Sequence, residues 1–157
     1  MRALIQRTSK AEVIVDSKTV GKIGPGLVIL LGIKNGDSEK DIDYLINKIV
    51  NLRVFPSDKG HFEKSLIDIK SEGAMPSSRL QDFGVLVISQ FTLYGSTKKS
   101  RRPDFIEAAK PEIAEGLYEL FVKKMQKTGI TVATGEFGAM MDVHLVNEGP
   151  VTLMIES

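Results

Sequence analysis

The run from Leu27 to Ile33 restricts the fold more than any other feature, because it is apolar at nearly every position. A strand that is apolar on both sides is typical of the interior of a sheet. The run is followed by Asn35-Gly36-Asp37-Ser38, which breaks the strand and offers helix N-caps. From Glu39 to Leu52 the apolar residues recur at helical spacing, so the sequence predicts a buried strand followed by an amphipathic helix.

Further strands and a second helix are predicted on either side of this pair. The second amphipathic helix is expected over Pro111–Gln126, and the segment Ser71–Asp82 is expected to be an exposed loop. Strands are expected over Ala3–Arg7, Ala11–Asp16, Thr19–Ile23, Arg53–Phe55, Val85–Leu93, Thr131–Ala133, Met140–Val146 and Val151–Ile155. The pattern predicts one mixed α/β domain over residues 1–157 and leaves the pairing of the strands open.

The composition is that of an ordinary soluble globular domain, with 42% hydrophobic and 26% charged residues. Cysteine is absent, which excludes disulfides, thiolate nucleophiles and cysteine-based zinc sites and fits a reducing cytosol. The first residues contain no long apolar stretch, and no apolar run approaches the ~20 residues that cross a bilayer. We therefore expect a cytoplasmic protein without a membrane partner.

The charge distribution limits how the chain could bind nucleic acid. The formal net charge is only +1, whereas a protein that binds nucleic acid through phosphate contacts alone is usually more basic. One local cluster of basic residues consists of Lys98, Lys99, Arg101 and Arg102. Taken by itself, such a run is more typical of a solvated loop than of an RNA contact.

Side chains suited to acid–base or metal chemistry are scarce. The two histidines, His61 and His144, are too far apart in the sequence to suggest a metal site or a histidine-based triad. The chain contains no P-loop, no dinucleotide-binding glycine motif, no zinc-protease motif and no nucleophile elbow. We expect no metal and no cofactor.

Polar residues replace apolar ones abruptly at the end of one predicted strand. Val85 to Ile88 is apolar, and Ser89-Gln90-Phe91-Thr92 follows directly. Binding residues often collect at the carboxyl ends of buried strands, so this stretch is a candidate site. The alternative is that Ser89 and Thr92 only satisfy nearby backbone groups.

The second unusual stretch is Asn147-Glu148-Gly149-Pro150-Val151-Thr152, between the last two predicted strands. Proline adopts the cis form at a cost of only ~0.5–1 kcal/mol, so a rigid Gly-Pro unit could serve in recognition. The pattern alone is more typical of a plain turn.

Together, these two stretches resemble the two signature motifs of D-aminoacyl-tRNA deacylases. The similarity extends over nearly the whole chain and includes Met1–Arg7, Gly24–Leu27, Asn51–Phe55, Arg102–Phe105 and Gly135–Met141. It implies a three-layer α/β fold with mixed β-sheets and two main helices, and a homodimer. It also implies a hydrolase that cleaves the ester bond of D-aminoacyl-tRNA in the proofreading of translation.

The resemblance implies a site shared between two protomers. Gly149-Pro150 would be a cis peptide that reaches into the partner's site and excludes an L side chain by steric clash. Arg7 would brace this element. Because glycine has no side chain to clash, glycyl-tRNA mischarged on tRNA(Ala) is also an expected substrate.

Four residues of the first motif would form the catalytic corner, namely Ser89, Gln90, Phe91 and Thr92. By the resemblance, backbone N–H groups near Phe91 and Thr92 would stabilise the oxyanion, and the 2′-hydroxyl of the tRNA would assist. A covalent role for Thr92 is the competing hypothesis. Threonine needs an adjacent base for that role, and neither Ser89 nor Gln90 is basic at pH 7.

The resemblance also implies residues that would bind the tRNA. Phe137 and Met141 would line a pocket for the terminal adenine, where stacking contributes ~1–3 kcal/mol. The alternative is that both are ordinary core residues. The basic run from Lys98 to Arg102 would contact phosphates of the tRNA without base specificity.

The chain departs from the family in three places. Ser71–Asp82 is longer than the usual turn, His61-Phe62-Glu63-Lys64-Ser65 replaces a frequent Met-Asn pair, and Ser100 replaces a frequent glycine. Two alternative functions stay open: a related tRNA editing deacylase with another amino-acid preference, and a nucleic-acid-binding protein without hydrolysis. The low net charge disfavours the second alternative.

Overall fold

The computed structural model of the chain describes residues 1–57, 60, 62–72, 82–98 and 101–157. Its main sheet has the strand order β2-β1-β3-β6-β7, with β8 also paired to β1, and β4 and β5 form a separate small sheet. The strands are β1 (Arg2–Val15), β2 (Lys18–Ile23), β3 (Gly26–Gly32), β4 (Phe55–Pro56), β5 (Phe62–Lys64), β6 (Gly84–Ser89), β7 (Thr131–Thr134) and β8 (Asp142–Glu156). The helices are α1 (Glu39–Asn51), α2 (Leu66–Glu72), α4 (Pro111–Lys127) and the 3-10 helix η1 (Phe91–Tyr94).

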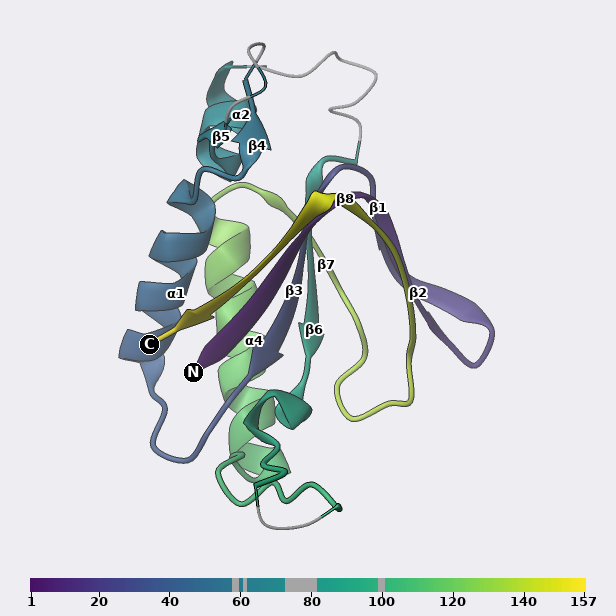
Figure 1. The fold of residues 1–157 in the computed structure, drawn as a ribbon, viewed down its shortest axis with the longest axis vertical. Helices are drawn as coiled ribbons and strands as arrows, with labels where there is room; N and C mark the ends of the chain where they lie inside the picture. The colour runs from purple at the N-terminus through teal and green to yellow at the C-terminus, as the bar shows by residue number, and fades with distance from the viewer. Residues whose placement is uncertain (58–59, 61, 73–81, 99–100) are drawn as a thin grey trace.

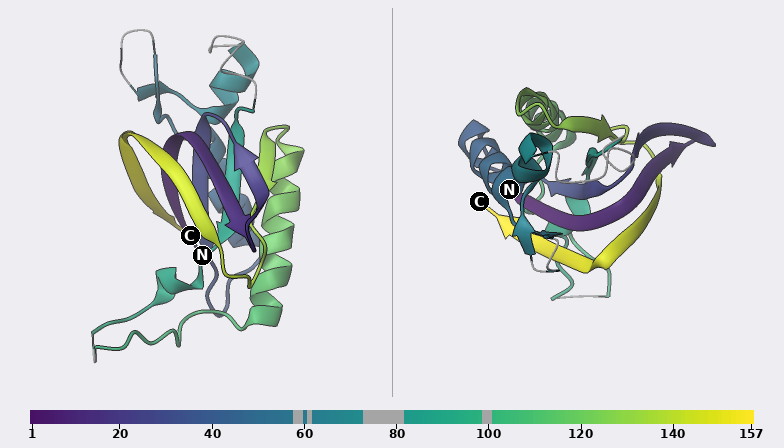
Figure 2. Two further views of the ribbon diagram at one scale, coloured as in Figure 1. Left: turned by 90° about the vertical axis from the view of Figure 1, so that its right-hand side faces the viewer. Right: turned by 90° about the horizontal axis from the view of Figure 1, so that it is seen from above.

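The elements are arranged in layers, which Figures 1 and 2 show from three directions. The helices α1 and α4 cover one face of β3 and β6, and the long strands β1 and β8 curve around the opposite side. One apolar core lies between the sheet and the helices, and a second lies inside the curve of the strands. This is the mixed α/β architecture that the sequence predicts.

The strand β3 is the central strand predicted from its apolar run. It pairs antiparallel with β1 and parallel with β6. Leu27 and Ile29 belong to the core beneath the helices, whereas Val28 belongs to the core inside the curve. All three are fully buried, because alternate residues of a strand face opposite sides of the sheet and both sides are covered here.

The helix α1 also follows the predicted pattern. Ile42, Leu45 and Ile49 are fully buried in the core that the helix shares with β3. The first turn is stabilised by Asp41, whose carboxylate accepts hydrogen bonds from the backbone N–H and Oγ of Ser38 at 2.8 and 2.9 Å.

The helix α4 packs beside α1, but its buried face differs from the predicted one. The apolar spacing predicts a face formed by Ile113, Leu117, Leu120 and Phe121. Phe121 is buried as predicted, together with Tyr118 and Met125, whereas Ile113 is 56% exposed. The hydroxyl of Tyr118 donates to the carbonyl of Val87 at 2.9 Å. This bond satisfies the polar end of the ring, so a tyrosine can occupy the core where apolar spacing does not predict one.

Two pairs of predicted strands are each one continuous strand. Ala3–Arg7 and all of Ala11–Asp16 except Asp16 lie in β1, whose register with β8 shifts between Thr8 and Ala11. Met140–Val146 and Val151–Ile155 both overlap β8, which begins at Asp142. The predicted breaks are irregularities within paired strands, and a bulged strand contains the same turn-forming residues as a true turn.

Other element boundaries also differ from the predictions. The predicted strand Val85–Leu93 ends at Ser89, after which the chain turns into η1. The predicted strand Arg53–Phe55 overlaps β4 only at its last residue. The predicted strands over residues 11–16, 19–23 and 131–133 correspond to the end of β1, to β2 and to β7, and β1 and β2 pair antiparallel.

The helix α2 was not predicted from the sequence. Its start is marked by Asp68, which accepts hydrogen bonds from the backbone N–H and Oγ of Ser65 at 2.9 and 2.7 Å. This Ser-x-x-Asp spacing is a helix-start signal that the sequence contained. The predicted loop Ser71–Asp82 begins inside α2, and residues 73–81 lie outside the described residues.

No helix in the described part of the chain is both long enough and apolar enough to span a bilayer.

Candidate active site

The first motif begins where β6 leaves the core. The first five residues of the strand are buried, and Ser89 and Gln90 are half-buried at its carboxyl end. The backbone N–H of Gln90 donates to the carbonyl of Leu31 at 2.8 Å, which ties this end of β6 to β3. The chain then turns into η1, so Phe91 and Thr92 lie at the surface.

Two side chains, Arg2 and Phe105, hold η1. Nη1 of Arg2 donates to the carbonyl of Leu93 at 2.7 Å, and its guanidinium lies 4.6 Å from the centre of the Tyr94 ring. Phe105 meets Phe91 edge to face, with ring centres 4.9 Å apart. Burial raises the pKa of Tyr94 to about 12, so its hydroxyl stays protonated at neutral pH and does not serve as a base.

The side chains of Gln90 and Thr92 are joined by a hydrogen bond in which Nε2 of Gln90 donates to Oγ1 of Thr92. An amide does not take up a proton at neutral pH, so this contact does not activate the hydroxyl of Thr92. The arrangement disfavours a covalent role for Thr92 and fits a positioning role.

A hollow of about 510 Å³ opens beside the carboxyl end of β6. Ser89, Gln90 and Phe91 line it together with Phe137 and Met141, so the fold brings together five of the predicted site residues. Its other lining residues are Leu31, Ile33, Ile88, Pro111, Ala114, Gly138, Ala139, Met140 and Val143. None of these described residues carries a formal charge, so the hollow suits an uncharged, flat group.

Phe137 and Met141 are placed by packing against neighbouring elements. The ring centre of Phe137 lies 5.7 Å from that of Tyr118, whose hydroxyl is bonded to Val87 of β6. Met141 packs over Gly135, where an added Cβ would lie only 2.6 Å from the Met141 Sδ. The absence of a side chain at Gly135 therefore leaves room for Met141 at the edge of the hollow.

The second motif forms a bulge in β8. The Gly149–Pro150 peptide is cis, as the resemblance implies, and both residues are exposed. The side-chain oxygen of Asn147 accepts a hydrogen bond from the N–H of Val151 at 3.0 Å, and its Nδ2 donates to Oγ1 of Thr152 at 2.8 Å. Asn147 therefore closes the base of the bulge.

Arg7 lies beneath this bulge and is only 6% exposed. Its Nε donates to the carbonyl of Glu148 at 3.2 Å, and its Nη1 donates to the carbonyl of Val54. Its guanidinium also lies 5.3 Å from the centre of the Phe62 ring. A buried cation needs such partners, so Arg7 is held in one position between the bulge and the segment that leads to β4.

Within the chain, the two motifs lie near opposite ends of the part of β1 between Arg2 and Arg7. Arg7 contacts the bulge, whereas Arg2 contacts η1. Five residues of extended strand span about 16 Å. Figure 1 shows the bend of β8 at the top of the sheet and the segment after β6 at the bottom. Gly149-Pro150 therefore lies away from the hollow within this chain.

Lys98, Arg101 and Arg102, three of the predicted basic residues, lie on the loop that follows η1. This basic loop is closed by two backbone hydrogen bonds between Ser96 and Asp104, at 2.8 and 2.9 Å. Lys99 lies outside the described residues. The exposed members are Lys98, Arg101 and Arg102.

Comparison with known proteins establishes the family to which the chain belongs. The family model for D-Tyr-tRNA(Tyr) deacylase matches residues 4–156. The chain belongs to this deacylase family. It is 51% identical over 157 residues to a D-aminoacyl-tRNA deacylase of Aquifex aeolicus, covering 100% of this chain and 98% of that protein. It is 48% identical to a D-aminoacyl-tRNA deacylase of Bacillus thuringiensis, covering 100% of this chain and 99% of that protein.

Solved structures resemble this member of the deacylase family. The c-Myc DNA Unwinding Element Binding Protein superposes with a TM-score of 0.86 at 38% identity, covering 100% of this chain and 99% of that chain. A probable eukaryotic D-amino acid tRNA deacylase superposes with a TM-score of 0.72 at 15% identity, covering 99% and 98%. At that lower identity the likeness shows the fold alone.

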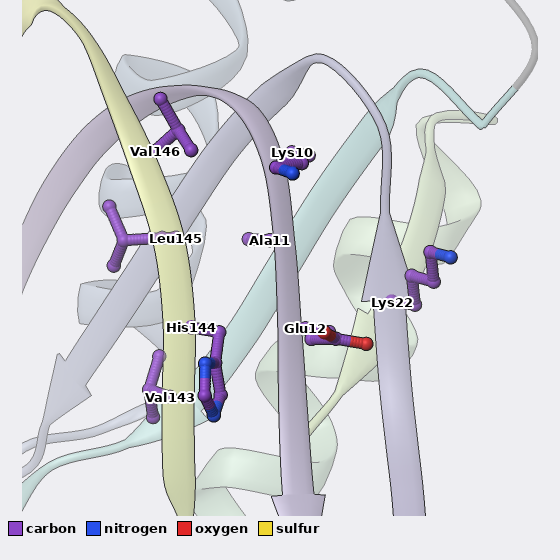
Figure 3. A pocket seen from close by; sticks show the side chains of 8 residues that line it. All are labelled: Lys10, Ala11, Glu12, Lys22, Val143, His144, Leu145 and Val146. Carbon is purple, nitrogen blue, oxygen red and sulfur yellow. The ribbon is translucent and has the colours of Figure 1, made fainter.

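A second hollow, of about 560 Å³, lies over β1, β2 and β8 and contains no residue of the two deacylase motifs (Figure 3). Glu12 points from β1 toward Lys22 of β2, and it is paired in register with Lys22 and His144. Among the described residues, no group of three or more His, Cys, Asp or Glu side chains is arranged to hold a metal ion. The hollow beside η1 is therefore the candidate active site.

Several residues that shape the candidate site were not predicted from the sequence. Arg2 and Phe105 lie in segments that match the family, but nothing in their spacing indicated contact with η1. Pro111 and Ala114 line the hollow because of the direction in which α4 packs, and Tyr118 supports Phe137 from the same helix. Such contacts depend on helix orientation, which periodicity does not specify.

Proposed function

We propose that the chain hydrolyses the ester bond of D-aminoacyl-tRNA in the cytoplasm, releasing a free D-amino acid and tRNA for proofreading of translation. Family membership supports the reaction class, because the matching model spans nearly the whole chain. The observation that carries the proposal is that the first motif meets Phe137 and Met141 around one uncharged hollow. In this proposal the chain acts as a single domain over residues 1–157.

The hollow would bind the terminal adenosine of the tRNA. Its volume of about 510 Å³ lies within the range of small-molecule sites. Phe137 and Met141 present apolar surface to a base, and stacking on such surface contributes ~1–3 kcal/mol. The ester carbon would then lie near Ser89, Gln90 and Phe91 at the edge of the hollow.

Hydrolysis would proceed by attack of water on the ester carbonyl, with the tRNA 2′-hydroxyl assisting. The carbonyl oxygen becomes negatively charged during this attack and needs hydrogen-bond donors. The first N–H groups of a helix have no carbonyl partner within it, so those of Phe91 and Thr92 at the start of η1 are suited to this role. Gln90 and Thr92 would position the substrate, since their mutual hydrogen bond provides no base.

Gly149-Pro150 would select the handedness of the substrate. The pair is exposed, and it is fixed from below by Arg7 and at its base by Asn147. A rigid backbone element can reject an L side chain by collision while accepting the D side chain. Glycine carries no side chain, so glycyl-tRNA mischarged on tRNA(Ala) would also be hydrolysed.

A second copy of the chain would bring this filter to the hollow. Contiguous exposed apolar surface marks interaction sites on soluble proteins. The exposed apolar residues of β8 are Val143, Val146, Leu153 and Met154. Met154 lies in register with Leu4, which lies in register with Leu30, so an apolar row crosses three strands on one face of the sheet. We propose a homodimer in which each Gly149-Pro150 reaches the hollow of the partner.

The basic loop would bind the phosphates of the tRNA. Lys98, Arg101 and Arg102 project from the loop that directly follows η1, and Lys99 belongs to the same run. Phosphate contacts give affinity without base specificity, which suits an enzyme that accepts many tRNAs.

The test is a paired assay of D-tyrosyl-tRNA and L-tyrosyl-tRNA with the purified protein. We expect release of D-tyrosine and almost no release of L-tyrosine. Equal rates on the two esters would contradict the filter, and no release from either would contradict the reaction. Sedimentation of the same sample measures its oligomeric state, for which we expect a dimer.

Nucleic-acid binding without hydrolysis is the second candidate function, because one structural neighbour is named a DNA unwinding element binding protein. Binding of tRNA and of single-stranded DNA, measured beside the hydrolysis assay, separates the two. Tight DNA binding by a protein that releases no D-tyrosine would favour the second candidate.

A further inference from the structure

Phe105 joins the basic loop to the turn that carries the first motif. Its ring meets Phe91 edge to face, with an interplanar angle of 72° and ring centres 4.9 Å apart. It also packs against Gly95, where an added Cβ would lie 2.9 Å from Cε1 of Phe105. Phe91 begins η1 and Gly95 follows its last residue, so one ring contacts both ends of the turn.

The position of Phe105 is itself fixed by the backbone on both sides. The paired hydrogen bonds between Ser96 and Asp104 close the basic loop directly before it. A few residues later, the N–H of Ala109 donates to the carbonyl of Ile33 at 2.9 Å, which anchors this segment to the end of β3. The ring is therefore held between a closed loop and the central sheet.

We propose that Phe105 is a positioning residue for the hydrolysis, holding Phe91 and the backbone of η1 in the geometry that the reaction requires. This inference rests on the proposed function. Phe91 lines the hollow and Phe105 does not, so Phe105 acts through Phe91. Because Phe105 directly follows the closed basic loop, it also couples the position of that loop to η1.

The physical reason is the small size of the turn. A 3-10 helix of four residues contains few internal hydrogen bonds, so the directions of its N–H groups depend on contacts with its surroundings. Removing the Phe105 ring opens space into which Phe91 and the turn can move. A displacement of about 1 Å at reacting groups can lower a rate about 100-fold.

The experiment compares Phe105→Ala with Ile106→Ala, whose side chain is 81% exposed in the same segment. The two substrates are D-tyrosyl-tRNA and the D-tyrosyl ester of adenosine, which lacks the phosphates that the basic loop would bind. We expect Phe105→Ala to lower kcat about 10- to 100-fold on both substrates, and Ile106→Ala to resemble the wild type. Thermal unfolding of each variant verifies that it is folded.

The outcomes separate this inference from the proposed function. If the wild type hydrolyses neither substrate, the proposed function fails. If the wild type hydrolyses both and Phe105→Ala keeps the kcat of Ile106→Ala, the positioning role of Phe105 is overturned. A change confined to KM for the tRNA substrate would overturn it as well, because that result would limit Phe105 to the binding of phosphates.

A double-mutant cycle with Gly95→Ala provides a second test that does not depend on the stability of one variant. The new methyl group would lie 2.9 Å from the Phe105 ring and 3.0 Å from the carbonyl oxygen of Thr92. We expect Gly95→Ala to lower kcat in the native background and to cause a smaller fold-loss when Phe105 is alanine, because the ring contact is then absent. If the fold-loss in kcat of the double variant equals the product of the losses of the two single variants, the coupling between Gly95 and Phe105 is overturned.

Discussion

The guanidinium of Arg7 lies directly against Gly149, and a Cβ added to Gly149 would come within 3.0 Å of Nη2 of Arg7. This contact ties a buried cation of β1 to an exposed bulge of β8. Arg7 also donates to the carbonyls of Val54 and Glu148, so it cannot move aside without leaving a buried polar group unpaired. The bulge is therefore supported by a side chain with little freedom to move.

Gly149→Ala should displace the bulge and lower the hydrolysis of D-tyrosyl-tRNA. Gly149 has a φ of +126°, which L side chains rarely adopt, and the new methyl group would meet both Arg7 and Val151. Backbone strain of this kind costs about 1–3 kcal/mol. Gly116→Ala is the matched control, because nothing lies within 4 Å of its Cβ position in α4. That control should keep its activity and gain about 0.5–1 kcal/mol of stability. If Gly149→Ala distinguishes D-tyrosyl-tRNA from L-tyrosyl-tRNA as well as the wild type does, the proposed filter is contradicted.

Arg7→Lys should loosen the bulge while keeping the positive charge. A single ammonium cannot reproduce both the Nε contact to Glu148 and the Nη1 contact to Val54. We expect a loss of about 1–3 kcal/mol in the free energy of unfolding, measured with urea, and a smaller ratio of D to L hydrolysis. Arg53→Lys, at an exposed position, is the control for the change of residue type. An unchanged ratio in Arg7→Lys would remove Arg7 from the filter.

Tyr118→Phe should lower the free energy of unfolding at neutral pH. It should also make that free energy fall less steeply as the pH rises above 10. The variant loses the hydrogen bond to Val87, which costs about 0.5–1.5 kcal/mol, but it keeps the ring contact to Phe137, so activity should persist.

Burial raises the pKa of Tyr118 from 10.0 to about 12. Below pH 10 the phenol is neutral in both the folded and the unfolded chain. As the pH rises from 10 toward 12, only the unfolded chain ionises, so the stability that depends on Tyr118 is lost in that interval. Urea unfolding at pH 8, 10 and 11 should therefore show wild type and variant converging, and a constant difference would contradict the assignment.

Changing both Lys98 and Arg101 to Ala should weaken tRNA binding specifically. Each lost phosphate contact should make the slope of log binding constant against log salt concentration shallower by roughly one. We expect a higher KM for D-tyrosyl-tRNA and unchanged hydrolysis of the short adenosine ester. Lys18→Ala, at the exposed first residue of β2, removes a lysine outside the basic loop and serves as the control. An unaltered salt slope would place the RNA contact elsewhere on the surface.

The residues around the hollow illustrate how far the sequence predicts a site. Ser89-Gln90-Phe91-Thr92 was a candidate because polar residues abruptly follow an apolar strand, whereas Gly149-Pro150 taken alone resembled a plain turn. Both were assigned to a site only through their resemblance to the two family motifs. The contact of Phe105 with Phe91 could not be predicted in this way. It depends on how the basic loop folds back onto β3, and that path is set by backbone hydrogen bonds between residues distant in the sequence.

Three features could be predicted from local sequence: the central strand from Leu27 to Ile33, the buried face of α1 and the positions of the two motifs along the chain. These features depend on apolar spacing and turn-forming residues within short segments, so they can be read locally. The continuity of β1 and β8 through their irregular segments depends instead on pairing between distant parts of the chain. Thr8 and Val146, for example, are bonded across a separation of 138 residues, and no local pattern specifies such a partner. The same long-range pairing separates Gly149-Pro150 from the hollow within the chain.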